Sequence, residues 1–123
     1  HRVIEGFMAQ TGDVKYGNIF LGVSPEMVGR GGSDLDDLKS EFSDIPFDRG
    51  IVGMARSQNP NSANSQFFIM LADGHFLNGN YTVFGKVISG MDVVDKIKKG
   101  DPDKNGMIEK DPDYMREVLI KNK

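Results

Sequence analysis

The sequence predicts a single, mainly β domain over residues 1–123. Its apolar residues gather in short segments, and several of these alternate with polar residues at the period of a strand. Gly, Asn and Pro bound most of these segments, as expected for strands joined by turns. With 123 residues and 38% hydrophobic content, the chain is long enough to bury one core.

We expect the first strands at residues 1–13, in the stretch HRVIEGFMAQTGD. Apolar and polar residues alternate imperfectly here, and Gly6 indicates a bulge, so two strand pieces across a kink fit best. Arg2 and Gln10 are then polar residues on strands that otherwise look buried. A buried guanidinium must find acceptors or a ligand, which makes Arg2 a candidate site residue, with a solvated terminal arginine as the alternative.

Residues 14–38 carry Gly, Asp and Ser with isolated apolar residues, and this weaker signal predicts a long loop. The cluster GRGGSD at residues 29–34 lacks the Lys-Ser/Thr ending of a phosphate-binding loop, so we interpret it as turns. Residues 43–50 form a turn-rich link, and residues 50–55 supply the next strand.

The stretch GMARSQNPNSANSQFFIML at residues 53–71 predicts a strand, a polar loop at residues 57–65 and a buried strand at residues 66–71. The amide of Gln66 can both donate and accept, which suits a peptide bond. Phe68, two residues later, shares its face of the strand. This arrangement favours a peptide-binding site, with an ordinary hairpin as the alternative.

The last third of the chain predicts two more strands and a helix. Phe76 and Leu77 are large apolar residues in a polar loop, where such pairs often line pockets. Residues 81–88 alternate as a strand after a tight Asn-Gly turn. Residues 91–99 have the spacing and charge polarity of a short amphipathic helix, and residues 115–121 alternate as a last strand.

Composition excludes several classes of function. The chain has 15 basic and 18 acidic residues and a pI of about 5.3, so it has no electrostatic footprint for nucleic acid or an anionic membrane. The absence of Cys excludes disulfides, thiolate metal sites and a Cys nucleophile. No apolar run approaches the length of a membrane span. No signal peptide is recognised in a chain that begins at His1 rather than Met, so the start of the natural protein is left open. The location is left unknown, with the cytoplasm slightly favoured over the periplasm.

The motifs resemble the cyclophilin family of peptidyl-prolyl cis-trans isomerases from the first residue to nearly the last. They are HRVIEGFMAQTGD, GMAR, NSQFFI, FLNGNYTVFGKV and GMDVVDKI, and the loop MARSQNPNSANSQFFI is most similar to bacterial members. The resemblance implies a closed antiparallel barrel of eight strands, capped by two helices, with the site on its outer face. It also implies that the family's first two strands and first helix, which precede the His-Arg pair, are missing from this chain.

The resemblance also implies the site residues. The catalytic set falls on Arg2, Gln10 and Phe68. The substrate-binding set falls on Phe7, Met8, Ala55, Arg56, Ser57, Gln66, Phe76, Leu77 and Tyr81. Phe76 stands where many members have Trp, and Tyr81 where many have His, so weak binding of cyclosporin is expected.

The implied reaction is rotation about an X-Pro bond in proline-containing peptides and unfolded proteins, by a protein that is a monomer when complete. Rotation breaks amide resonance, and Arg2 can donate to the proline nitrogen as its lone pair becomes available. This chemistry requires no nucleophile, metal or cofactor. His1 and His75 are therefore expected in structural or solvent-exposed roles.

Two other classes of function remain open at this point. One is a module that binds proline peptides without accelerating them, although the presence of Arg2 favours the enzyme. The other is a calcium-binding loop, because Asp101, Asp103, Asn105 and Gly106 match the opening of an EF-hand loop. Pro112 stands where the closing Glu of that loop belongs, which favours an exposed acidic loop instead.

Overall fold

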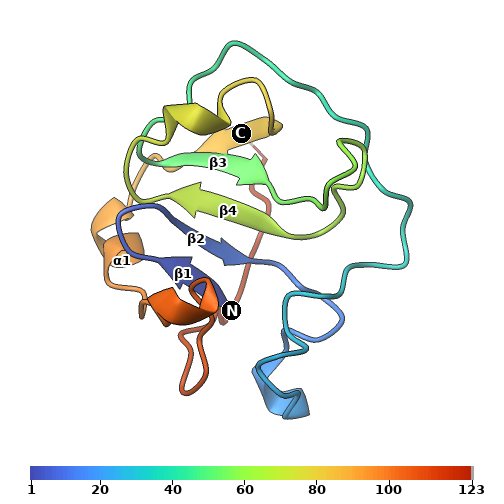
Figure 1. The fold of residues 1–123 in the computed structure, drawn as a ribbon, viewed down its shortest axis with the longest axis vertical. Helices are drawn as coiled ribbons and strands as arrows, with labels where there is room; N and C mark the ends of the chain where they lie inside the picture. The colour runs from blue at the N-terminus through green and yellow to red at the C-terminus, as the bar shows by residue number, and fades with distance from the viewer. Residues whose placement is uncertain (123) are drawn as a thin grey trace.

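The computed structural model describes residues 1–122, which form an antiparallel sheet surrounded by long loops and short helices (Figure 1). The mainly β fold predicted from the sequence is confirmed. Within these residues the sheet has five strands in the order β1-β2-β4-β3-β5. They are β1 (Arg2–Ile4), β2 (Met8–Thr11), β3 (Ile51–Met54), β4 (Phe67–Met70) and β5 (Val83–Lys86).

The helices are all short. The predicted helix at residues 91–99 is confirmed as α1 (Met91–Asp95), which ends earlier than the pattern indicated. Single 3₁₀ turns occur at Ile19–Leu21, His75–Leu77 and Pro102–Lys104. Across residues 1–122, none of these helices has the length and apolar character needed to cross a bilayer.

The β1–β2 pair is a tight hairpin, so the predicted kink with a bulge at Gly6 is wrong. Gly6 has a φ of 72°, and the N–H of Phe7 donates to the carbonyl of Ile4 at 3.0 Å. Glycine adopts this left-handed conformation at no steric cost, which allows the chain to reverse within a few residues. The reversal places Arg2 directly opposite Gln10.

The central strands approach one another closely around Gly53. A Cβ atom at this position would lie 2.7 Å from the ring of Phe68 and 2.8 Å from the ring of Phe47. Beside it the register between β3 and β5 shifts, because Val52 pairs with Gly85 while Gly53 pairs with Val83. The missing side chain of Gly53 therefore makes room for two aromatic rings on one face of the sheet.

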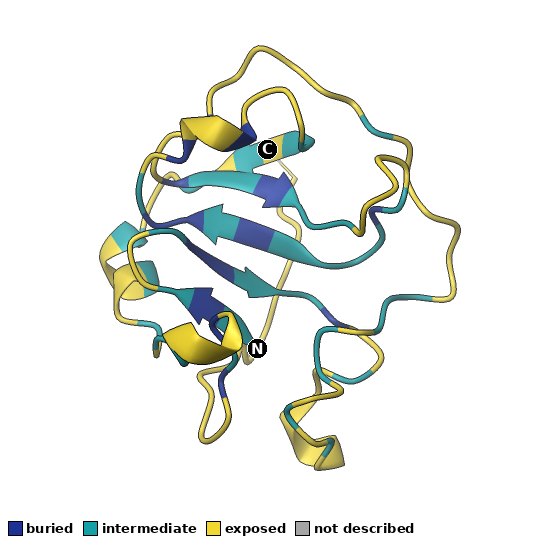
Figure 2. Ribbon diagram, in the orientation of Figure 1, coloured by how far each residue is buried: buried dark blue, intermediate teal, exposed yellow. Residues whose placement is uncertain are grey.

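The sheet packs a separate apolar cluster on each face. Buried positions occur along the strands of the sheet (Figure 2). Met8 and Ala9 are neighbours on β2, so their side chains point to opposite faces. Met8 belongs to a cluster with Phe47, Phe68, Met70 and Leu77. Ala9 belongs to a cluster with Val3, Leu71 and Ile108, against which α1 packs through Met91 and Val94.

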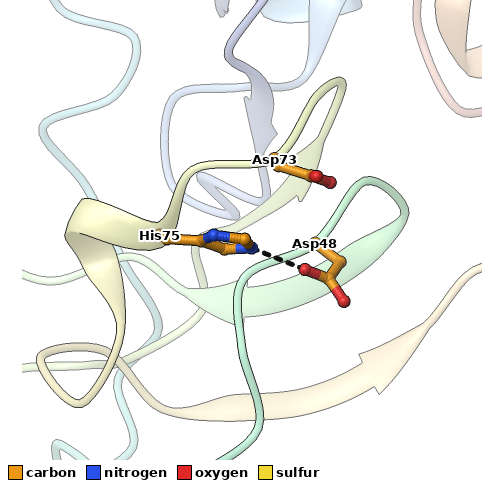
Figure 3. A group of neighbouring side chains, drawn as sticks. All are labelled: Asp48, Asp73 and His75. Carbon is orange, nitrogen blue, oxygen red and sulfur yellow. Dashed lines mark hydrogen bonds and ion pairs between the residues drawn. The ribbon is translucent and has the colours of Figure 1, made fainter.

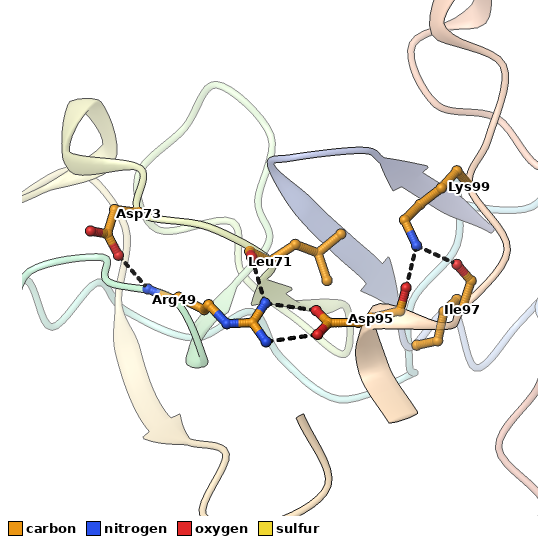
Figure 4. Close-up of polar contacts among 6 residues, drawn as sticks. All are labelled: Arg49, Leu71, Asp73, Asp95, Ile97 and Lys99. Atoms are coloured by element: carbon orange, nitrogen blue, oxygen red, sulfur yellow. Dashed lines mark hydrogen bonds and ion pairs between the residues drawn. The ribbon is translucent and has the colours of Figure 1, made fainter. Parts of the chain in front are cut away.

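The side chain of Arg49 fastens α1 to the sheet (Figure 4). Its guanidinium donates to both carboxylate oxygens of Asp95, at 2.6 and 2.7 Å, and to the carbonyl of Leu71 at 2.8 Å. Its backbone N–H donates to Asp73. A bidentate ion pair of this kind fixes the orientation of the guanidinium relative to the carboxylate, whereas a single hydrogen bond does not.

The predicted last strand at residues 115–121 is wrong. Residues 109–122 contain no strand and are exposed, with Ile120 95% accessible. Alternation alone does not make a strand when no neighbouring strand offers backbone partners. The pairing places β1 and β5 at the two edges of the sheet, so the closed eight-stranded barrel stays a prediction.

Candidate functional site

A chain of hydrogen bonds crosses one face of the sheet. Arg2 donates through Nη1 to Gln10 Oε1, and Gln10 donates through Nε2 to Gln66 Oε1, both at 2.9 Å. Gln66 in turn donates to the carbonyls of Gly29 and Gly31, at 2.8 and 2.9 Å. The three side chains predicted as polar site residues are therefore brought together, and each holds the next.

The other edge of the Arg2 guanidinium is bound by one residue of a distant loop. Nε donates to the backbone carbonyl of Asn105, and Nη2 donates to its side-chain Oδ1, both at 2.9 Å. A guanidinium has five N–H donors, so these three bonds leave two N–H groups for a ligand. Burial lowers the pKa of Arg2, and the nearby Tyr81 opposes this shift. The side chain nevertheless stays charged at neutral pH.

An apolar group of side chains lies beside this polar chain. The register between β2 and β4 pairs Gln10 with Phe68, so the ring of Phe68 stands next to the polar residues. Phe68 is only 5% exposed and packs with the buried Met8 and Leu77. The half-buried Phe7 packs against the same group, so the structure brings together the four apolar residues that the resemblance assigned to the site.

Arg56 and Tyr81 form the wall above Phe68. The Tyr81 ring meets Phe68 edge-on, with centroids 5.8 Å apart. The Arg56 guanidinium lies over the Tyr81 ring and donates to the carbonyls of Ser57, Gln58 and Asn80. Arg56 therefore ties together two loops that are separate in the sequence.

A cavity of about 300 Å³ opens beside this wall. Five of the predicted site residues line it: Gln10, Ala55, Arg56, Ser57 and Gln66. Phe76 lies outside the cavity. It is 72% exposed, and its ring stacks at a tilt on Phe7 with centroids 5.3 Å apart. Of the other predicted residues, Arg2 belongs to the chain of hydrogen bonds, and the apolar group beside it holds Phe7, Met8, Phe68, Leu77 and Tyr81.

Comparison with known proteins places this chain in a family. The model of the family described as cyclophilin type peptidyl-prolyl cis-trans isomerase/CLD matches residues 1–120. The chain belongs to this family. It is 66% identical over 120 residues to a probable peptidyl-prolyl cis-trans isomerase of Brucella abortus (strain 2308), an alignment that covers 98% of this chain and 61% of that protein.

Other relatives give the same assignment. The chain is 40% identical over 116 residues to peptidyl-prolyl cis-trans isomerase B of Escherichia coli (strain K12), covering 87% of this chain and 64% of that one. The crystal structure of cyclophilin AquaCyp293 from Hirschia baltica superposes with a TM-score of 0.64 and 26% identity, covering 80% of this chain and 52% of that chain. This cyclophilin-type chain spans about three fifths of the length of the curated relatives it matches.

Three residues that support the candidate site were missed in the sequence analysis. Phe47 is fully buried and stacks on Phe68 at 5.7 Å, but it sits in a turn-rich link whose pattern gave no sign of this contact. Asn105 was weighed only as a calcium ligand. Asp13 ends the first strand motif as part of Thr-Gly-Asp, a signal for a turn-forming carboxylate.

Asp13 organises the loop that holds Gln66. It is 5% exposed and accepts hydrogen bonds from the backbone N–H groups of residues 15, 16, 29 and 31. Burial alone would raise the pKa of Asp13, but the four N–H donors outweigh it and lower the pKa. The carboxylate therefore fixes the backbone whose carbonyls accept from Gln66.

The structure also gathers Asp48, Asp73 and His75 at the surface, with ligand atoms within 4.8 Å of one another (Figure 3). His75 Nε2 lies 2.7 Å from Asp48 Oδ1, and this hydrogen bond raises the pKa of His75. The His75 side chain is 57% exposed, in keeping with the solvent-exposed position expected for it from the sequence.

Proposed function

We propose that this chain is a non-covalent peptidyl-prolyl cis-trans isomerase, acting on X-Pro bonds of peptides and unfolded proteins. The observation that carries the proposal is the position of Arg2. Its guanidinium is held beside the apolar group around Phe68 by three hydrogen bonds, and two of its N–H groups remain for a ligand. Membership of the cyclophilin-type family supports the same conclusion.

The chemistry needs an apolar contact and one well-placed donor. An X-Pro bond rotates over a barrier of about 18–20 kcal/mol because rotation breaks amide resonance. As the bond twists, the proline nitrogen regains a lone pair that can accept a hydrogen bond from Arg2. This bond forms fully only in the transition state, so it accelerates rotation rather than merely strengthening binding.

Phe68 and its neighbours offer the surface on which the proline ring rests. The ring stays still against Phe7 and Phe68 while the acyl side of the bond turns. The cavity lined by Ala55, Arg56 and Ser57 accommodates the peptide backbone next to the proline. We assign Gln10 a positioning role, because its carbonyl oxygen accepts from Arg2 and its amide is already committed to Gln66.

The proposal is tested by measuring isomerisation of a proline peptide, either in a protease-coupled assay or by exchange NMR. An isomerase gives exchange between cis and trans signals that is faster than the uncatalysed interconversion over tens to hundreds of seconds. A chain that shifts the peptide signals without faster exchange is a binding module, and the proposal is then wrong.

We also propose that the sheet is part of the closed eight-stranded barrel that the family resemblance implies. One feature supports this. The strand β5 ends the sheet, and its Phe84 is 56% exposed although it packs edge-on against Phe67. Fusing the first two strands and first helix of the Escherichia coli relative to this chain should raise the melting temperature. An unchanged melting temperature would count against the barrel.

A further inference from the structure

We propose that Asn105 is the residue that positions Arg2 for the reaction, an inference that rests on the proposed function. Two of the three hydrogen bonds of the Arg2 guanidinium go to this one residue, which lies 103 positions away in the sequence. Asn105 contributes its backbone carbonyl to Nε and its side-chain oxygen to Nη2, each at 2.9 Å.

The two bonds to Asn105 fix the plane of the guanidinium. Nε–H and one Nη2–H point in parallel from the same edge of the planar group, so two acceptors on one residue prevent it from rotating. Gln10 holds Nη1 from the other side. Gln10 by itself would leave the guanidinium free to swing about a single hydrogen bond, so Asn105 sets its direction.

The backbone conformation of Asn105 explains how one residue presents both oxygens. It has φ 55° and ψ 35°, the left-handed region, where Asn is among the few tolerated residues other than Gly. It closes the 3₁₀ turn Pro102–Lys104, which begins at Asp101, whose side chain accepts from the N–H of Asp103. The turn and the Asn together aim the carbonyl and the amide oxygen toward Arg2.

The loop is fastened to β1, so the position of Asn105 is set by the sheet. The N–H of Val3 donates to the carbonyl of Gly106 at 2.9 Å, and the N–H of Ile108 donates to the carbonyl of His1 at 3.0 Å. Gly106 itself lies so close to β1 that a Cβ would be 2.6 Å from the side chain of Ile4. These contacts hold the residues that directly follow Asn105 against β1.

This role replaces the calcium-binding alternative. In an EF-hand loop the residues corresponding to Asp101, Asp103 and Asn105 direct oxygens at one cation. Here the Asn105 oxygens bind the Arg2 guanidinium, and the Asp101 carboxylate binds the turn of its own loop. The loop therefore binds the guanidinium cation of Arg2 in place of a metal ion.

The sharpest test is the variant Asn105→Gly. Glycine accepts the left-handed backbone and keeps the carbonyl that binds Nε, so only the Oδ1 contact is lost. We expect kcat for a proline peptide to fall by about 3- to 10-fold with KM unchanged, as for the loss of one hydrogen bond that acts in the transition state. Asn105→Asp keeps an acceptor oxygen in place and should retain most of the activity.

A double mutant separates positioning from a structural role. In the Arg2→Ala background, Asn105→Gly should cause no further loss of kcat, because the residue it positions is gone. An unchanged kcat in Asn105→Gly, or the same loss with and without Arg2, would overturn the inference. If Arg2→Ala itself kept full activity, the proposed role of Arg2 would fail instead, whereas the proposed function fails only if the wild-type chain does not accelerate exchange.

A spectroscopic measurement keeps the inference testable if a variant does not fold. In the wild-type chain, the Arg2 Nε–H should give a separate NMR signal that exchanges slowly with water, because it is bound to the Asn105 carbonyl. The exposed Arg116 provides the comparison within the same spectrum. Equal, fast exchange of the two signals would show that Asn105 does not hold Arg2.

Discussion

The guanidinium carbon of Arg56 lies 4.5 Å from the centre of the Tyr81 ring. This contact borders the apolar group around Phe68, because the Tyr81 ring meets the Phe68 ring edge-on at 5.8 Å and the Phe47 ring at 6.5 Å. The family resemblance implies His at position 81 in many members. The contribution of this stack of Arg56 on Tyr81 to peptide binding can be measured.

Replacing Arg56 by Ala should weaken substrate binding more than catalysis. The change removes the cation–π contact with Tyr81 and the hydrogen bonds to the carbonyls of Ser57 and Asn80. With about 0.5–1 kcal/mol for an exposed cation–π contact and a similar amount for the hydrogen bonds, KM should rise by about 5- to 30-fold. Arg116→Ala, in the exposed C-terminal segment, is the matched control. Equal KM values for the two variants would refute the role of the stack.

Replacing Arg2 by Ala should abolish most of the rate enhancement. Loss of a preorganised donor to a transition state typically lowers kcat by about 10²-fold or more. Arg2→Lys should recover little, because an ammonium cannot make the parallel bonds to Asn105 and still reach the substrate. Steady-state kinetics on a proline peptide give the answer, with circular dichroism as the check that both variants fold. A folded Arg2→Ala protein with wild-type kcat would contradict the proposal.

The exposed Phe76 should make cyclosporin a poor inhibitor. By family resemblance, sensitive members present an indole N–H here, which Phe cannot supply, although its ring stays stacked on Phe7. An unpaired ligand carbonyl costs about 1–3 kcal/mol, or about 5- to 150-fold in affinity. Phe76→Trp should therefore improve inhibition with little change in peptide turnover. Equal inhibition of both proteins in one titration would show that Phe76 is not the rim residue.

The buried Asp13 should give stability that depends on pH. Asp13→Asn turns an N–H toward backbone N–H donors, which should lower the free energy of unfolding by about 1–3 kcal/mol at neutral pH. Because the folded pKa of Asp13 is lowered, its contribution is complete above the unfolded value of about 3.9 and is lost as pH falls through the folded pKa. Urea titrations at several pH values measure this difference.

The expected outcome for Asp13 has a clear control. Asp36→Asn changes the same group at an exposed position of the neighbouring loop and should leave stability nearly unchanged. The difference in unfolding free energy between wild type and Asp13→Asn should become smaller in acid. The corresponding difference for Asp36→Asn should stay small at every pH. A gap for Asp13→Asn that stayed constant down to the lowest pH would show that the carboxylate charge does not stabilise the loop.

Local pattern was sufficient for the strands that lie inside the sheet. Residues 50–55 and 66–71 were predicted as strands and contain β3 and β4, because a strand buried between two others needs apolar residues along its length. The same rule failed at residues 115–121, where alternating residues have no neighbouring strand. It also missed that Gly6 closes a hairpin, because a bulge and a turn both select glycine.

The sequence by itself also determined which residue types form the candidate site, since Arg2, Gln10, Gln66 and Phe68 were all predicted before their positions were known. Only the tertiary structure decided what holds them. The bonds between Arg2 and Asn105 join residues 103 positions apart, and Phe47 reaches Phe68 from a link with no regular pattern. Sequence periodicity reports which face of one segment is apolar, but contacts between distant segments depend on strand register and loop path, which arise only when the whole chain packs.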